Sequence, residues 1–158
     1  MFTPSRAWQA LQMAVQHLLG PLGMATLDQS DWSYRPDYHN SDEGDDPSTA
    51  HGFNYHQGPE WLWPVGYLLQ ALLHFAPLVG GVSELRRTIR KVKSILSRHF
   101  VEIQQSPWRS LPELTNKNGS VCHDSSPAQA WSMASILEVT APSIRYRVFV
   151  KHDSVFLY

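Results

Sequence analysis

The sequence predicts an all-α domain in which helices are joined by long loops. Its 158 residues are enough for one ordinary domain and little more. Three segments place apolar residues three or four positions apart, which is the spacing of a helix that buries one face, and a fourth segment is an uncharged apolar run. Two long segments between them have no apolar period and are rich in Pro, Gly, Asn and Asp.

The first predicted helix covers residues 4–19. Thr3 is a candidate N-cap, and Pro4 suits the first helical position. One face carries the apolar residues Trp8, Leu11, Val15, Leu18 and Leu19. We expect the helix to stop at Gly20-Pro21, because both residue types are poor continuers of a helix.

Residues 21–60 form the first predicted loop. Seven of the chain's 14 acidic residues lie between Asp28 and Asp46, and Arg35 is the only Lys or Arg among them. A structureless run of about 40 residues inside a compact domain is uncommon and is usually functional or disordered.

Two helices are predicted next, over residues 61–82 and 84–104. The first contains no charged side chain and is followed by a basic stretch, so a membrane span is one interpretation. Pro64, Gln70, His74 and Pro77 interrupt the run, and we favour a buried helix of an all-α domain. The second is amphipathic, with its basic residues on a solvated face.

The last predicted helix runs from about residue 127 to 139, after a second loop at 105–125. Ser126-Pro127-Ala128-Gln129 has the form of a capping box with Pro at the first helical position. Residues 143–158 alternate apolar and polar side chains instead, which is typical of a strand.

Charge and composition argue against several classes of partner. The net charge of −1 provides no basic surplus for nucleic acid. Cys122 is the only cysteine, so no internal disulfide can form, and no apolar signal segment is recognised, so we expect a cytoplasmic protein. The histidines lack zinc-ligand spacing and no glycine-rich phosphate loop is present, so we expect neither a metal nor a cofactor.

Two features suggest chemistry on sugars. Glycoside hydrolysis uses two carboxyl groups, and aromatic rings pack on the C–H faces of a sugar. Residues 52–63 combine four aromatic side chains with Asn54, His56, Gln57 and Glu60. Glu113 lies on a loop that contains proline and precedes a helix, a position from which its carboxyl group could act as a general acid or base. The alternatives are a structural loop with core tryptophans and a solvated surface glutamate.

Longer strings of this sequence resemble the C-terminal region of glycogen debranching enzymes, in order from about residue 2 to 139. The most specific are GFNYHQGPEWLWP at 52–64 and LPELTN at 111–116, which QAWS follows at 129–132. The resemblance implies an amylo-α-1,6-glucosidase on an (α/α)6 barrel that removes, by inversion, the glucose left at a glycogen branch point. It also implies a separate 4-α-glucanotransferase region elsewhere in the full-length family.

The resemblance assigns roles to individual residues. Glu113 matches the general base, which activates the attacking water. The expected substrate-binding residues are Asn54, Tyr55, His56, Gln57, Glu60, Trp61 and Trp131, and the expected substrate is glycogen or phosphorylase limit dextrin.

The match covers only part of such an enzyme. We count about four of the barrel's twelve helices, and the general acid, an aspartate, is expected before the chain begins. Residues 1–139 are therefore expected to form a partial (α/α)6 barrel that is inactive by itself. We expect residues 140–158 to be a divergent tail whose strand pattern is incidental. The alternative functions are a non-catalytic glycogen-binding or interaction module and, behind it, a membrane-anchored helical protein.

Overall fold

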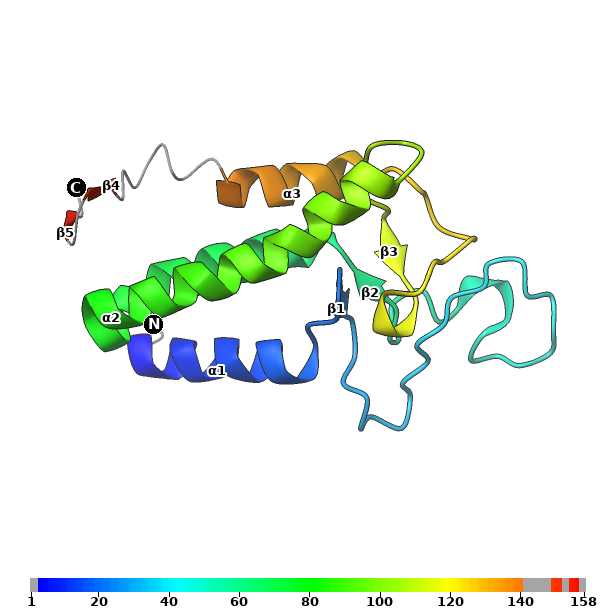
Figure 1. The fold of residues 1–158 in the computed structure, drawn as a ribbon. Coiled ribbons are helices and arrows are strands. Elements are labelled where there is room, and N and C mark those ends of the chain that lie inside the picture. The colour runs from blue at the N-terminus through cyan, green and yellow to red at the C-terminus, as the bar shows by residue number, and fades with distance from the viewer. Residues whose placement is uncertain (1–2, 141–148, 152–153, 157–158) are drawn as a thin grey trace.

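The computed structural model describes residues 3–140, 149–151 and 154–156, and this part of the chain is mostly helical (Figure 1). Its three α-helices are α1 (Pro4–His17), α2 (Trp63–Gln105) and α3 (Ala130–Thr140). A small sheet is formed by β1 (Met24–Ala25), β2 (Glu60–Trp61) and β3 (Leu114–Thr115). Two short 3-10 turns, η1 (Ala50–Gly52) and η2 (Lys117–Gly119), lie in the loops.

Helix α1 begins where the sequence predicts. Pro4 opens it after an extended Thr3, but the Thr3 side chain makes no capping hydrogen bond. The helix ends at His17, two residues before the predicted end, because Leu18 is the C-cap and Leu19 already forms an antiparallel bridge with Met24. Its apolar face, which includes Trp8 and Leu11, packs against the main hydrophobic core.

Helix α2 is a hairpin of two helical arms. Gly80 and Gly81 have non-helical backbone angles, and Figure 1 shows the second arm running back beside the first. The φ angle of Gly81 is 59° with ψ at −152°, a conformation that is essentially restricted to glycine. The predicted break between the 61–82 and 84–104 helices is therefore confirmed, a few residues earlier than expected.

Within the described residues, α2 is long and apolar enough to cross a membrane by length and composition alone, with a mean hydropathy of 1.5 in its most apolar window. A core helix of a soluble protein passes the same test. In this fold, residues Leu68, Leu69 and Leu72 of that arm are buried in the core.

Helix α3 begins at Ala130, later than the predicted start near residue 127, and the predicted capping box does not form. The Ser126 hydroxyl donates to the Ala128 carbonyl, and the backbone N–H of Gln129 donates to the Leu111 carbonyl. The hydroxyl is thus bonded within its own segment and the Gln129 N–H is bonded to the loop before β3, so neither is free to form the capping box. Helix α3 instead packs closely on α2, where a side-chain carbon added to Gly66 would lie 2.1 Å from the Ser135 carbonyl oxygen.

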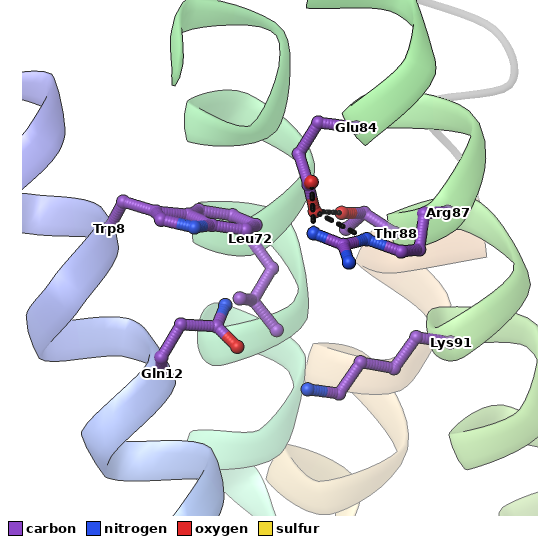
Figure 2. A pocket seen from close by; sticks show the side chains of 7 residues that line it. All are labelled: Trp8, Gln12, Leu72, Glu84, Arg87, Thr88 and Lys91. Atoms are coloured by element: carbon purple, nitrogen blue, oxygen red, sulfur yellow. Dashed lines mark hydrogen bonds and ion pairs between the residues drawn. The ribbon is translucent and has the colours of Figure 1, made fainter. Parts of the chain in front are cut away.

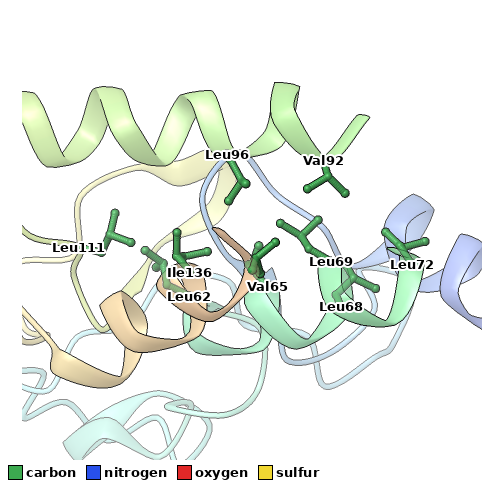
Figure 3. Close-up of a cluster of buried hydrophobic side chains, with 10 residues drawn as sticks. Leu62, Val65, Leu68, Leu69, Leu72, Val92, Leu96, Leu111 and Ile136 are labelled. Carbon is green, nitrogen blue, oxygen red and sulfur yellow. The ribbon is translucent and has the colours of Figure 1, made fainter. Parts of the chain in front are cut away.

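The main core lies between the two arms of α2 and is closed by α1, α3 and the loop before β3 (Figure 3). Ten buried side chains form it: Leu62, Val65, Leu68, Leu69, Leu72, Val92, Leu96, Leu111, Ile136 and Val139. Seven of these belong to the two segments, 61–82 and 84–104, that the sequence predicted as one buried and one amphipathic helix, which is the origin of the cluster.

The small sheet was not predicted. Its strands are antiparallel in the order β1-β2-β3, with Trp61 opposite Met24 and Leu114, and Glu60 opposite Ala25 and Thr115. Strands of two residues are too short to produce a recognisable alternation, so the sequence analysis placed all three in loops or at a helix start. The expectation of a purely helical fold is corrected to a mostly helical one with this sheet at one end (Figure 1).

The tail also contains regular structure. Strands β4 (Phe149–Lys151) and β5 (Ser154–Phe156) pair antiparallel. The expectation that the strand pattern is incidental is therefore wrong for these residues, where the apolar alternation does correspond to strands. The rest of the predicted tail from residue 141 on lies outside the described residues.

Candidate functional site

Backbone hydrogen bonds hold Glu113 on both sides. Its carbonyl accepts the N–H of Leu62 at 3.2 Å, next to the start of α2, and its own N–H donates to the Ser126 carbonyl at 2.9 Å. The carbonyl of Leu111, two residues earlier, accepts the N–H of Gln129 at 2.9 Å. The Glu113 loop is thus fixed between the segment that begins α2 and the segment that leads into α3.

The half-buried carboxylate of Glu113 accepts two described hydrogen bonds. The Tyr55 hydroxyl donates to Oε1, and the Ser126 backbone N–H donates to Oε2 at 3.4 Å. Burial raises the pKa of the Tyr55 hydroxyl far above its usual value, and the hydrogen bond to Glu113 and its charge add to the effect. Tyr55 therefore keeps its proton at neutral pH and acts as a hydrogen-bond donor to Glu113.

Aromatic rings surround Tyr55. Its ring centroid lies 4.7 Å from that of Tyr38, 4.6 Å from that of Trp61 and 4.7 Å from that of His56. His56 also stacks on Trp61 at 4.9 Å, and the Trp61 indole N–H donates to the Tyr55 carbonyl at 3.1 Å. We call Tyr38, Tyr55, His56 and Trp61 the Tyr55 cluster. The structure thus brings the 52–63 segment and Glu113 together.

Glu60 lies on the other face of the sheet, because successive side chains of a strand point to opposite faces. Its buried carboxylate accepts the backbone N–H groups of Asn118 at 2.9 Å and Gly119 at 3.1 Å, and the Thr115 hydroxyl at 3.3 Å. Burial raises the pKa of Glu60, and these hydrogen bonds act in the opposite direction. Glu60 therefore holds η2 against the sheet and does not share a face with Trp61.

Asn54 and Gln57 hold the loop that presents Tyr55. The fully buried Asn54 donates from Nδ2 to the Asp37 carbonyl at 2.6 Å, while its Oδ1 has no described hydrogen-bond partner. The Gln57 backbone N–H donates to the Asn54 carbonyl at 2.9 Å, and its carbonyl accepts the Arg35 N–H at 2.6 Å. These two residues therefore connect the Tyr55 loop to the 35–38 segment.

Trp131 stacks on Trp63 at the start of α3, with ring centroids 4.5 Å apart and planes 13° apart. Tyr67, one helical turn after Trp63, meets the Trp63 ring edge-on at 5.8 Å. The sequence predicted Trp131 as a substrate-binding residue and counted Trp63 among the aromatic residues of the 52–63 segment, with a core tryptophan as the alternative. It did not single out Tyr38 or Tyr67, because periodicity cannot show which rings meet across helices.

Two hollows lie away from Glu113. One is lined by side chains of α1 and both arms of α2 near the hairpin tip, and Figure 2 shows Glu84 there, bonded by Arg87 and Thr88. The other contains Glu60, His17 and Arg98 on the far face of the sheet. Among the described residues, no group of three or more His, Cys, Asp or Glu is placed to hold a metal ion.

This chain is similar to known proteins of one kind. A family model described as amylo-alpha-1,6-glucosidase matches residues 1–138. A Saccharomyces cerevisiae protein named glycogen debranching enzyme is 44% identical over 146 residues, an alignment that covers 88% of this chain. The chain spans 10% of the length of that yeast protein.

Proposed function

This chain belongs to the amylo-α-1,6-glucosidase family, and on that premise we propose that it supplies the general base and part of the sugar pocket of a glycogen-debranching glucosidase. The proposed reaction is hydrolysis of the single α-1,6-linked glucose at a glycogen branch point, with inversion at the anomeric carbon. The proposed substrate is glycogen or phosphorylase limit dextrin, and the proposed location is the cytoplasm.

The observation that carries this proposal is the contact between Glu113 and Tyr55. A general base must present a carboxylate oxygen in a fixed direction, within hydrogen-bond reach of the water it activates. Tyr55 and Ser126 hold one oxygen each, and the backbone of Glu113 is bonded on both sides. The carboxylate is therefore oriented by its own surroundings before any substrate binds.

In the proposed inverting reaction, Glu113 removes a proton from water as that water attacks the anomeric carbon, and a general acid protonates the leaving oxygen on the other side. The two carboxyl groups of such enzymes stand about 6.5–9.5 Å apart, which leaves room for the water. We propose that the acid is an aspartate of the upstream region that the family's full-length members contain.

The remaining predicted site residues divide into two roles in this proposal. Tyr55, His56 and Trp61 offer ring surfaces and polar edges to the glucose, and Trp131 offers a ring to the substrate beside it. Asn54, Gln57 and Glu60 hold the loops and the sheet that carry those rings, through the contacts described above. We also propose that the four helical segments, α1, the two arms of α2 and α3, are part of an (α/α)6 barrel.

A second candidate function is glycogen binding without hydrolysis. It is favoured by the aromatic rings beside Glu113, because Tyr38, Tyr55 and Trp61 can pack on a sugar without a second carboxyl group. In that case the chain by itself would bind glycogen and release no glucose.

The test uses two proteins. The 158-residue chain is assayed for glucose release from phosphorylase limit dextrin and for co-sedimentation with glycogen. A chimera of the yeast relative, with the matching segment replaced by residues 1–138 of this chain, is assayed beside it. We expect release by the chimera only, and we expect Glu113→Gln to reduce it about 10²–10⁴-fold.

The matched control is Glu43→Gln, a glutamate on the exposed part of the first loop, which should leave glucose release unchanged. A chimera that debranches equally well with Glu113→Gln would show that Glu113 is not the base. Binding of glycogen by a chain whose chimera stays inactive would favour the second function.

A further inference from the structure

We infer that the stacked pair Trp63–Trp131 is a platform for a pyranose ring of the glucan chain that carries the cleaved glucose. This inference rests on the proposed function, because it assigns the glucose itself to the Glu113 side and the neighbouring chain to the tryptophan pair. The sequence predicted Trp131 as a substrate-binding residue but did not indicate that Trp63 stacks on it.

The rings of Trp63 and Trp131 lie face to face. Two indole rings stacked at 4.5 Å and only 13° from parallel cover one face of each ring. Trp131 is nevertheless 49% exposed, so much of its remaining surface faces solvent. Flat, exposed aromatic faces bind the C–H surfaces of sugar rings, because burying both surfaces removes apolar area from water.

The pair is connected to the Glu113 loop through backbone hydrogen bonds. Leu62, the residue before Trp63, donates its N–H to the Glu113 carbonyl, and Gln129, two residues before Trp131, donates to the Leu111 carbonyl. The two tryptophans thus come from the two segments that hold the Glu113 loop. A ring on the platform would be next to a sugar at Glu113.

The tryptophan pair is continuous with the Tyr55 cluster. Trp63 and Tyr55 both pack against the buried cluster that contains Tyr38, Trp61 and Leu114. Tyr67, which is 47% exposed, contacts the Trp63 ring edge-on. An aromatic surface therefore extends from Glu113 to the first turn of α3, which suits a chain of sugar rings more than a single glucose.

A docking partner protein is the competing occupant. Trp131, Ala134 and Leu137 follow each other at three-residue steps on α3 and are all exposed. A protein that packs on this helix would use Leu137 as well as Trp131. A sugar ring would use the indole alone, so the two occupants are separable by substitution.

The experiment measures binding by the full 158-residue chain, using isothermal titration calorimetry with two probes. One is glucose, and the other is a dextrin that carries a single α-1,6-linked glucose. We expect Trp131→Ala to weaken dextrin binding about tenfold, with glucose binding unchanged. Trp131→Tyr, which keeps a flat ring, should restore most of the affinity.

Two control variants accompany it. Leu137→Ala removes an exposed apolar side chain of the same helix, and Trp32→Ala removes an indole that is 87% exposed on the first loop. Neither should change the affinity for dextrin or glucose. Thermal unfolding of each variant checks that the fold is retained.

Three outcomes would overturn the inference. If Trp131→Ala binds dextrin as the unmodified chain does, the platform is absent while the proposed function stands. If Leu137→Ala weakens dextrin binding as much as Trp131→Ala does, the surface is not specific to the indole. If the unmodified chain binds neither probe, the platform is absent; an active chimera then leaves the proposed function standing, and an inactive one removes both.

Discussion

At the scale of single residues, two glutamates of this chain have opposite environments. Glu113 is half-buried and its carboxylate is shared between a tyrosine hydroxyl and one backbone N–H. Glu60 is buried, and three donors from β3 and η2 surround its carboxylate. The first arrangement leaves lone pairs for a water molecule, whereas the second commits the carboxylate to holding a turn.

Glu60→Gln tests the structural role of that residue. An amide nitrogen would face a backbone N–H of η2, so we expect the free energy of unfolding at pH 7 to fall by about 1–3 kcal/mol. The measurement is urea unfolding, with Glu43→Gln as the exposed control. Unchanged stability of Glu60→Gln would contradict this role.

The pH dependence of the same variant has a definite sign. The folded pKa of Glu60 is raised, so the native state holds this proton more tightly than the unfolded chain does. Its contribution to stability is therefore complete below about pH 4.3, the ordinary pKa of Glu, and is lost as the pH rises through the folded value. The stability difference between the unmodified chain and Glu60→Gln should be larger at pH 4 than at pH 7.

At the scale of elements, the fold depends on close contact between α2 and α3. Gly66 is the point of closest approach, since any side chain there would meet the backbone carbonyl of Ser135. The buried Ser132 and Ser135 are also small, so the face of α3 that meets α2 allows the backbones to approach. This contact places the first turn of α3, with Trp131, beside Trp63.

We expect Gly66→Ala to destabilise the chain by about 1–3 kcal/mol, because the added methyl group must displace a helix backbone and not a flexible side chain. This outcome opposes helix propensity, which favours Ala over Gly by about 1 kcal/mol. The check is urea unfolding, with Lys93→Ala on the exposed face of α2 as the control. A Gly66→Ala chain as stable as the original would mean that α3 can move away freely.

At the scale of the whole molecule, apolar side chains remain exposed at the tip of the α2 hairpin. Leu78 is 55% exposed, and Val79 and Val82 beside it are 36% and 41% exposed. Contiguous apolar patches of this kind mark surfaces that bind other polypeptides or cause association.

We therefore expect the chain by itself to self-associate at micromolar concentration. The double substitution Leu78→Glu and Val82→Glu should shift it toward the monomer, because like charges would have to be buried in any contact at the tip. Analytical ultracentrifugation measures the shift, and Arg90→Glu, on an exposed part of the second arm, is the charge control. A chain that is monomeric without substitution would contradict this expectation.

The sequence by itself determined α1, the presence of two helices within α2, and the family. Each rests on local or linear information: the apolar spacing of the helices and the strings around residues 52–64 and 111–116. The structure moved the break between the two helices to Gly80–Gly81, a few residues before the predicted position. The sequence also singled out Glu113, Tyr55 and Trp131, although their roles remain predictions.

Only the tertiary structure decided which of these residues meet. It paired Tyr55 with Glu113, moved Glu60 to the opposite face of a sheet that two-residue strands conceal, and stacked Trp131 on Trp63. It also used Ser126 and Gln129 for the Glu113 loop and not for a helix cap. Contacts between residues more than fifty positions apart depend on how the helices pack, and no local pattern contains that information.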